Sequence, residues 1–329
     1  MARLDENKKH QNTTTKQENK NELIKLQFNS LFDLLKTFNS EQACINYLEK
    51  LRWSKTGVIS PFDSTSKVYS CAGNKYKCKN TGLYFNVRTN TIFDCTKITL
   101  QKWFISLWLI TSHKKGISSH QLAKDINVTQ KTAWFILQRI RHCFDLENDS
   151  KLNNEVEIDE TFIGGKNKNR HANKKVENSQ GRSVKDKTPV LGMVERKGKL
   201  VAKKVETTAE KHLTPEIIKH IKESATVYTD EWLGYKKIDK IYNHFVVNHG
   251  EKQFVDGLAY TNTMEGFWSI LKRGIVGIYH YVSRKHLQQY VDEFVFRYNT
   301  RNMISETARF DYLLSSVSNK YLSYKKLIA

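Results

Sequence analysis

From residue 155 onward the chain alternates apolar runs with amphipathic stretches, in an order that few folds accommodate. Strands are predicted at 155–159, 190–194, 200–205, 225–228 and 245–247, and helices at 213–224, at 235–241 and from Asn262 onward. Pro215 is expected in the first turn of the 213–224 helix, where its missing N–H costs little. The order of elements is β-β-β-α-β-α-β-α, which predicts a mixed sheet covered by helices.

This succession of elements is that of an RNase H-like domain. We therefore predict an α/β fold within an α+β multidomain chain, with this domain at 152–310 and its first and fourth strands as neighbours in the sheet. Four further segments are predicted: a disordered basic lead-in at 1–20, a helical hairpin with a small β-rich, ribbon-like unit at 21–98, a helix-turn-helix region at 99–148 and a C-terminal helical tail at 311–329.

Acidic residues are outnumbered in this chain, 34 against 54 Lys and Arg, so the positions of individual acids are informative. Asp159 ends the first predicted strand, Asp230 directly follows the fourth, and Glu265 lies near the start of the long helical region. We expect these three carboxylates to converge at one edge of the sheet. Hard divalent cations prefer oxygen ligands, and two of them about 4 Å apart catalyse in-line phosphodiester displacement. The trio therefore predicts a site for Mg²⁺ (or Mn²⁺).

The same acids are also compatible with purely structural roles. Asp230 could cap the following helix, and Glu265 suits the positive end of a helix dipole. Three further acids, Glu157, Glu160 and Glu231, compete for the ligand positions. Lys272 follows Glu265 by seven residues, which is two helical turns, so the two side chains share a face and the ammonium could hold a substrate phosphate.

The net charge of +20 and the pI near 9.6 indicate either a polyanionic partner, of which nucleic acid is the commonest, or a role in solubility. Residues 116–137 have the layout of a helix-turn-helix, with short polar residues at the start of the second helix, where a major groove would admit them. The alternative is a helical hairpin within a core. The predicted contacts with double-stranded DNA are Ser118, Gln121, Thr129, Gln130, Lys131, Thr132 and, from the long helical region, Arg273.

Cysteine usage and hydropathy suggest the compartment. The five cysteines are scattered without a C-x-x-C, the first 20 residues lack an apolar core, and the apolar stretch at 103–110 is far shorter than the ~20 residues of a membrane span. We expect a cytoplasmic protein with no membrane partner.

Several motifs together resemble bacterial insertion-sequence transposases of the DDE type, ISXO-like family. They are Lys115-Gly116-Ile117-Ser118, Lys131-Thr132-Ala133-Trp134, Glu157-Ile158-Asp159-Glu160-Thr161, Tyr228-Thr229-Asp230 and the run from Thr261 to Asn299. The resemblance implies a catalytic triad of Asp159, Asp230 and Glu265, accompanied by Lys272. It also implies an enzyme that binds the ends of its element, hydrolyses phosphodiester bonds and transfers 3′-hydroxyl ends into target DNA with two metal ions, as a homodimer or a larger synaptic assembly.

The sequence departs from this family in the β-rich unit. Many members carry a zinc ribbon there, but here Ser60-Pro61-Phe62-Asp63 replaces the first cysteine pair, and the second retains Cys78 with Thr81 in its partner's place. One thiolate cannot complete a tetrahedral zinc site, so we predict no zinc. Strands near 68–69, 83–87 and 91–93 are expected instead to be stabilised by Tyr69, Tyr76, Tyr84 and Phe85. The basic insertion at 166–187 is either a DNA clamp or a solvated loop.

Two other functions remain possible. One is a catalytically inactive DNA-binding regulator or domesticated transposase remnant. The other is a structure-specific nuclease that cuts but does not join. Carboxylates gathered against a polyanion argue against a pure binding protein.

Overall fold

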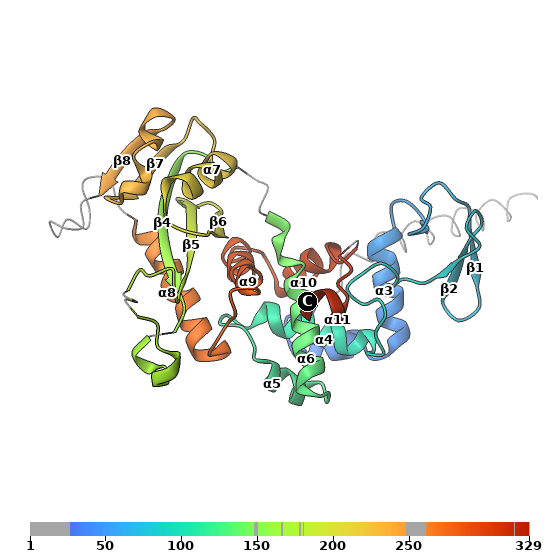
Figure 1. Ribbon diagram of the computed structural model, residues 1–329. Coiled ribbons are helices and arrows are strands. Elements are labelled where there is room, and N and C mark those ends of the chain that lie inside the picture. The colour runs from blue at the N-terminus through green and yellow to red at the C-terminus, as the bar shows by residue number, and fades with distance from the viewer. Residues whose placement is uncertain are drawn as a thin grey trace, which may run out of the picture.

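The computed structural model describes residues 27–147, 151–165, 167–177, 179, 181–247, 261–318 and 320–328 (Figure 1). The predicted lead-in at 1–20 lies outside these residues. A sheet with its covering helices occupies one side of the molecule, and a group of helices with a small β unit occupies the other. Among the described helices, none is long and apolar enough to cross a bilayer.

A five-stranded mixed sheet is built from the predicted strands. Its members are β4 (Glu155–Ile163), β5 (Thr188–Glu195), β6 (Leu200–Lys204), β7 (Thr226–Asp230) and β8 (Asn243–Val247), in the order β6-β5-β4-β7-β8. The strands β4, β5 and β6 pair antiparallel, whereas β7 pairs parallel with both β4 and β8. The prediction that the first and fourth strands are neighbours is confirmed.

Helices cover both faces of this sheet. Val156 and Ile158 of β4 pack with Leu213 and Ile217 of α7 (Glu210–His220) on one face. Ile163 packs on the opposite face with residues of α8 (Asn262–Gly274) and α9 (Leu287–Asn299). Because side chains alternate along a strand, the odd-numbered residues of β4 face α8 and the even-numbered residues face α7.

Three sequence predictions about this domain were wrong in detail. Asp159 lies in the middle of β4 and not at its end, because β5 pairs with β4 as far as Ile163. Pro215 lies inside α7 and not in its first turn, because the helix begins at Glu210. The predicted helix at 235–241 is two 3₁₀ turns, Leu233–Tyr235 and Ile238–Lys240.

The N-terminal part combines helices with a three-stranded antiparallel sheet. Its elements are α2 (Leu31–Thr37), α3 (Glu41–Trp53), β1 (Val68–Cys71), β2 (Lys75–Cys78), β3 (Tyr84–Phe85), α4 (Leu100–Ser112), α5 (Ser119–Asp125) and α6 (Gln130–Arg141). The predicted strand at 91–93 is absent from these described residues. Thr91 forms one isolated bridge to Ser318, and its hydroxyl bonds locally to Arg88 and Phe93.

The C-terminal helices α10 (Glu306–Ser315) and α11 (Tyr324–Ile328) return to the N-terminal part. Phe310 of α10 packs against Phe28 and Phe104 at centroid distances of 5.3 and 5.5 Å, and all three rings are fully buried. The two ends of the described chain therefore share one core.

A buried ion pair joins α6 to α9. Arg141 Nε lies 2.6 Å from Glu293 Oε2, and neither side chain is more than 1% exposed. Gln138 Nε2 also donates to the hydroxyl of Tyr290 at 3.1 Å. The second helix of the α5–α6 pair is thus fixed to a helix that packs on the sheet.

Candidate active site

Two aspartates meet because of the strand register. Glu157 of β4 lies beside Tyr228 of the parallel strand β7. Two residues beyond this pair, Asp159 of β4 and Asp230, the last residue of β7, lie close together. Residues 71 positions apart in sequence thereby become neighbours in the sheet.

The Asp159 carboxylate is held by two hydrogen bonds. Its Oδ1 accepts from the backbone N–H of Glu160 at 2.8 Å, and its Oδ2 accepts from the indole N–H of Trp268 at 3.0 Å. Trp268 reaches this position because α8 crosses β5 closely at Gly192, the residue paired with Asp159. A Cβ on Gly192 would lie 2.4 Å from Met264 Cε and 2.5 Å from Trp268 Cζ2, so only glycine fits there.

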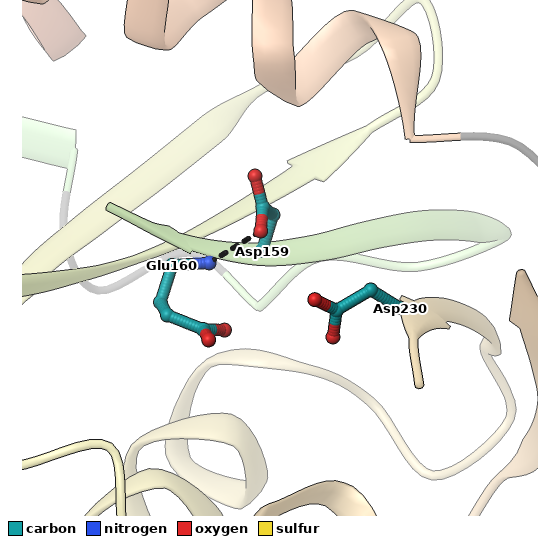
Figure 2. Close-up of side chains that lie close together, drawn as sticks. All are labelled: Asp159, Glu160 and Asp230. Carbon is teal, nitrogen blue, oxygen red and sulfur yellow. Dashed lines mark hydrogen bonds between the residues drawn. The ribbon is translucent and has the colours of Figure 1, made fainter. Parts of the chain in front are cut away.

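A third carboxylate joins this pair, and it is Glu160. Ligand atoms of Asp159, Glu160 and Asp230 all lie within 4.8 Å of one another (Figure 2). The hydroxyl of Tyr235 donates to Glu160 Oε2 at 2.6 Å, and the backbone N–H of Trp232 donates to Asp230 Oδ1 at 3.1 Å. From sequence Glu160 is only a competitor for a ligand position, because strand alternation sends residues 159 and 160 to opposite faces.

Burial and crowding of like charges perturb two of these groups. Burial, followed by the charge of Asp230, raises the pKa of Asp159 to about 6, although the bonds from Glu160 N–H and Trp268 oppose the rise. Burial raises the pKa of Glu160 to about 7, against the hydrogen bond from Tyr235. A divalent cation among these oxygens would relieve the repulsion, and an all-oxygen donor set suits Mg²⁺ or Mn²⁺.

Glu265 and Lys272 lie on one helix, as predicted. Both are exposed on α8, two turns apart. Glu265 stands one turn before Trp268, and its charge contributes to the raised pKa of Asp159. It lies outside the group whose ligand atoms are within 4.8 Å of one another, so its part in a metal site stays a prediction.

Glu157, another competitor, has a structural role. Its buried carboxylate accepts hydrogen bonds from the backbone N–H groups of Thr263 (2.9 Å) and Met264 (3.1 Å), and it forms an ion pair with Arg196 at 3.0 Å. It therefore satisfies the free N–H groups at the start of α8. Glu231 is exposed beside the site.

The predicted DNA-contacting residues of α5 and α6 divide into two groups. Ser118 and Thr129 cap the two helices, accepting from the N–H groups of Gln121 (3.1 Å) and Thr132 (3.3 Å). Gln121, Gln130 and Lys131 are exposed, and Thr132 is half-buried. Asn127 adopts a positive φ of 49° in the turn between the helices, which asparagine tolerates. Contact of these residues with DNA stays a prediction.

Arg273, also predicted to bind DNA, lies on the rim of a groove of about 950 Å³. The groove separates the end of α8 from the loop before α10, and Lys114, Lys115 and Arg301 contribute further positive charge to its lining.

The small β unit is stabilised differently from the prediction. Phe85 is buried and Tyr76 packs on it at 5.6 Å, but Tyr69 and Tyr84 are 42% and 59% exposed. Trp53 contributes to the cluster in their place, 5.4 Å from Tyr76. Cys78 is buried, and side-chain hydrogen bonds with Ser60, Ser66 and Thr81 outweigh burial and lower the pKa of its thiol to about 6.

The chain is similar to proteins of transposable elements. Residues 151–299 match the sequence model of the ISXO2-like transposase domain. An uncharacterized protein in transposable element ISH50 of Halobacterium salinarum is 28% identical, over 80% of this chain and 92% of the relative. A transposase-like protein of Haemophilus influenzae is 28% identical over 29% of this chain and 76% of its own length. The Mos1 strand transfer complex aligns with 12% identity and a TM-score of 0.26, over 67% of this chain and 79% of the Mos1 chain.

Proposed function

Since the chain belongs to the DDE transposases of insertion sequences through its ISXO2-like domain, we propose that it cuts the ends of its own element and joins their 3′-hydroxyls to target DNA. The observation that carries this proposal is the pair of aspartates, Asp159 and Asp230, on adjacent parallel strands. Ligand atoms of these two residues and of Glu160 lie within 4.8 Å of one another. Such a cluster is suited to phosphodiester chemistry in a chain with a net charge of +20.

Asp159 and Asp230 would hold Mg²⁺ or Mn²⁺, with Glu265 of α8 as the third catalytic carboxylate. Bound metal ions supply Lewis-acid stabilisation and an activated oxygen for an in-line displacement. Trp268 orients the Asp159 carboxylate from α8, and Glu160, oriented by Tyr235, would offer a further oxygen to the bound metal. Lys272 would contact a substrate phosphate beside Glu265.

The α5–α6 pair is the proposed end-binding unit. Its exposed polar residues Gln121, Gln130 and Lys131 would contact duplex DNA, and Arg273 with Lys114 and Lys115 would hold the phosphate backbone. Two ends must be processed together, which favours a homodimer or a larger synaptic assembly. We place the protein in the bacterial cytoplasm, at the nucleoid when bound.

One assay separates the three functions that the sequence left open. Purified protein is incubated with a labelled element end, a target plasmid and Mg²⁺. A joined product supports the transposase, a cut product alone indicates a nuclease, and a bound complex without cutting indicates a regulator. Asp159→Asn and Asp230→Asn are expected to abolish cutting while end binding stays within about twofold.

A second comparison addresses the third carboxylate. We expect Glu265→Gln to reduce cleavage about 100-fold or more and Glu160→Gln to reduce it about tenfold, as supporting residues of metal sites do. Glu231→Gln is the matched control, because Glu231 is exposed beside the same site. If Glu160→Gln is the more damaging of the two, Glu160 takes the place of Glu265 in the triad.

A further inference from the structure

The chain makes an unusual turn where α8 ends. A π-helical turn, Ile275–Tyr279, continues α8, and the backbone N–H of Tyr281 then donates to the carbonyl of Tyr279 at 2.6 Å. His280, between them, has φ 58° and ψ −47°. This is a γ-turn with a positive central φ, a rare and strained conformation for a residue that is not glycine.

The surroundings of this turn hold it in place. The hydroxyl of Tyr279 donates to Glu293 Oε1 at 2.6 Å, and Glu293 is paired with Arg141 of α6. The same hydroxyl packs against Gly116, just before α5, where a Cβ would lie 1.9 Å away and where φ is +92°. Strained conformations persist where neighbours over-determine them, and they concentrate at functional sites.

The turn and the α5–α6 pair form two walls of one cavity of about 690 Å³. His280 and Tyr281 contribute to one wall, and Tyr281 is 75% exposed. Ser118, Gln121 and Gln130, three of the residues predicted to contact DNA, line the other wall. No carboxylate occurs among the described residues that line this cavity, so nothing in its lining repels a phosphate backbone.

We infer that the Tyr279–Tyr281 turn is a second DNA contact, which engages the same element-end duplex as α5 and α6. This inference rests on the proposed function. Tyr281 offers a flat apolar ring and a hydroxyl, which suit sugar and base edges in a groove. The buried ion pair fixes α6 to α9 and, through Glu293, to Tyr279, so the turn keeps its place when α6 enters the neighbouring groove.

The test uses the full-length protein and fluorescence anisotropy with a labelled element end, over a range of salt concentrations. Tyr281→Ala is expected to weaken specific end binding about tenfold. Tyrosine carries no charge, so the salt dependence should stay that of the wild type, whereas Lys131→Ala should lower the salt slope by about one. Phe32→Ala is the control, since Phe32 is a 64% exposed aromatic residue on α2.

A second variant, His280→Gly, tests the residue that has the strained backbone conformation. Glycine adopts the His280 conformation without steric strain, so His280→Gly should melt no lower than the wild type and still bind element ends several-fold more weakly, because the imidazole that lines the cavity is removed. Wild-type end binding by both Tyr281→Ala and His280→Gly would overturn the inference and leave the transposase proposal intact. If the wild type does not prefer element ends over unrelated duplex, both proposals fail together.

Discussion

Trp268 donates its indole N–H to Asp159 across 109 residues of sequence, at 3.0 Å. The bond ties the strand that carries the first aspartate to the helix that carries Glu265 and Lys272. Trp268→Phe removes this bond together with part of the buried indole ring. We expect cleavage to fall about tenfold and the acidic limb of its pH profile to move upward, because the bond favours the ionised carboxylate. Trp108→Phe, a buried tryptophan on α4, controls for ring loss, and an unchanged pH profile in Trp268→Phe would contradict this role.

Gly192 allows α8 to approach the sheet. Gly192→Ala puts a methyl group 2.4–2.5 Å from Met264 and Trp268, so the helix must shift. We expect a loss of about 1–3 kcal/mol in the free energy of unfolding, measured by urea denaturation, and a larger loss of cleavage than the stability change explains. Gly165→Ala is the matched control, because nothing lies within 4 Å of the added Cβ. Equal behaviour of the two variants would show that this close approach is unimportant.

The sheet and the aspartate pair could be predicted because both depend on local pattern. Apolar alternation defines the strands, and the strand order brings Asp159 and Asp230 together before any contact is known. Glu160 could not be assigned this way. Strand β7 ends at Asp230, so the register leaves Glu160 without a β7 neighbour, and its side chain can approach the aspartates from the other face.

The role of Glu157 was equally hidden from sequence reasoning. Its partners Thr263 and Met264 lie 106 and 107 residues away, and nothing local distinguishes a carboxylate that caps a distant helix from one that binds a metal. Pro215 shows the limit for helix ends: proline is common in a first turn, but α7 extends five residues before it.

The raised pKa of Asp159 makes stability depend on pH. The value rises from 3.8 to about 6 on folding, so between those pH values the folded chain keeps a proton that the unfolded chain has released. The stabilisation that comes from the retained proton is therefore lost as pH rises from about 4 to 6. Above pH 6 the buried, ionised Asp159 carboxylate destabilises the folded chain. We expect metal-free Asp159→Asn to be more stable than the wild type at pH 7.5, by an amount on the order of 1–3 kcal/mol.

Thermal melts across pH 4–8 in chelator measure this effect. The difference between Asp159→Asn and wild type should disappear near pH 4, where both carry an uncharged side chain. Glu206→Gln, at an 84% exposed carboxylate, should show no such trend. A difference that persists at pH 4 would mean that shape, and not charge, causes it.

The β unit should fold without zinc. Hydroxyl groups stand where cysteines would complete a metal site, and Ser60, Ser66 and Thr81 form side-chain hydrogen bonds with the buried Cys78 thiol. We expect elemental analysis to find no stoichiometric zinc and chelator to leave the melting temperature unchanged. Cys78→Ala should cost about 1–3 kcal/mol, because a fully buried thiol is lost from the core. One tightly bound zinc per chain would contradict this account.

The buried pair of Arg141 and Glu293 should be the most sensitive point between the α5–α6 pair and the sheet domain. Glu293→Gln leaves the buried Arg141 guanidinium without a carboxylate partner and should cost about 3–5 kcal/mol in the free energy of unfolding. Arg141→Met should cost less, because Glu293 keeps its ion pair with Arg297 at 2.5 Å. The double variant should recover part of the Glu293→Gln loss, because the buried guanidinium of Arg141 is then also removed. Arg309→Met, which breaks the part-exposed pair with Glu306 at 2.9 Å, is the control and should cost less. If the double variant is as unstable as the sum of the singles, the two residues act independently and do not join the two parts of the chain.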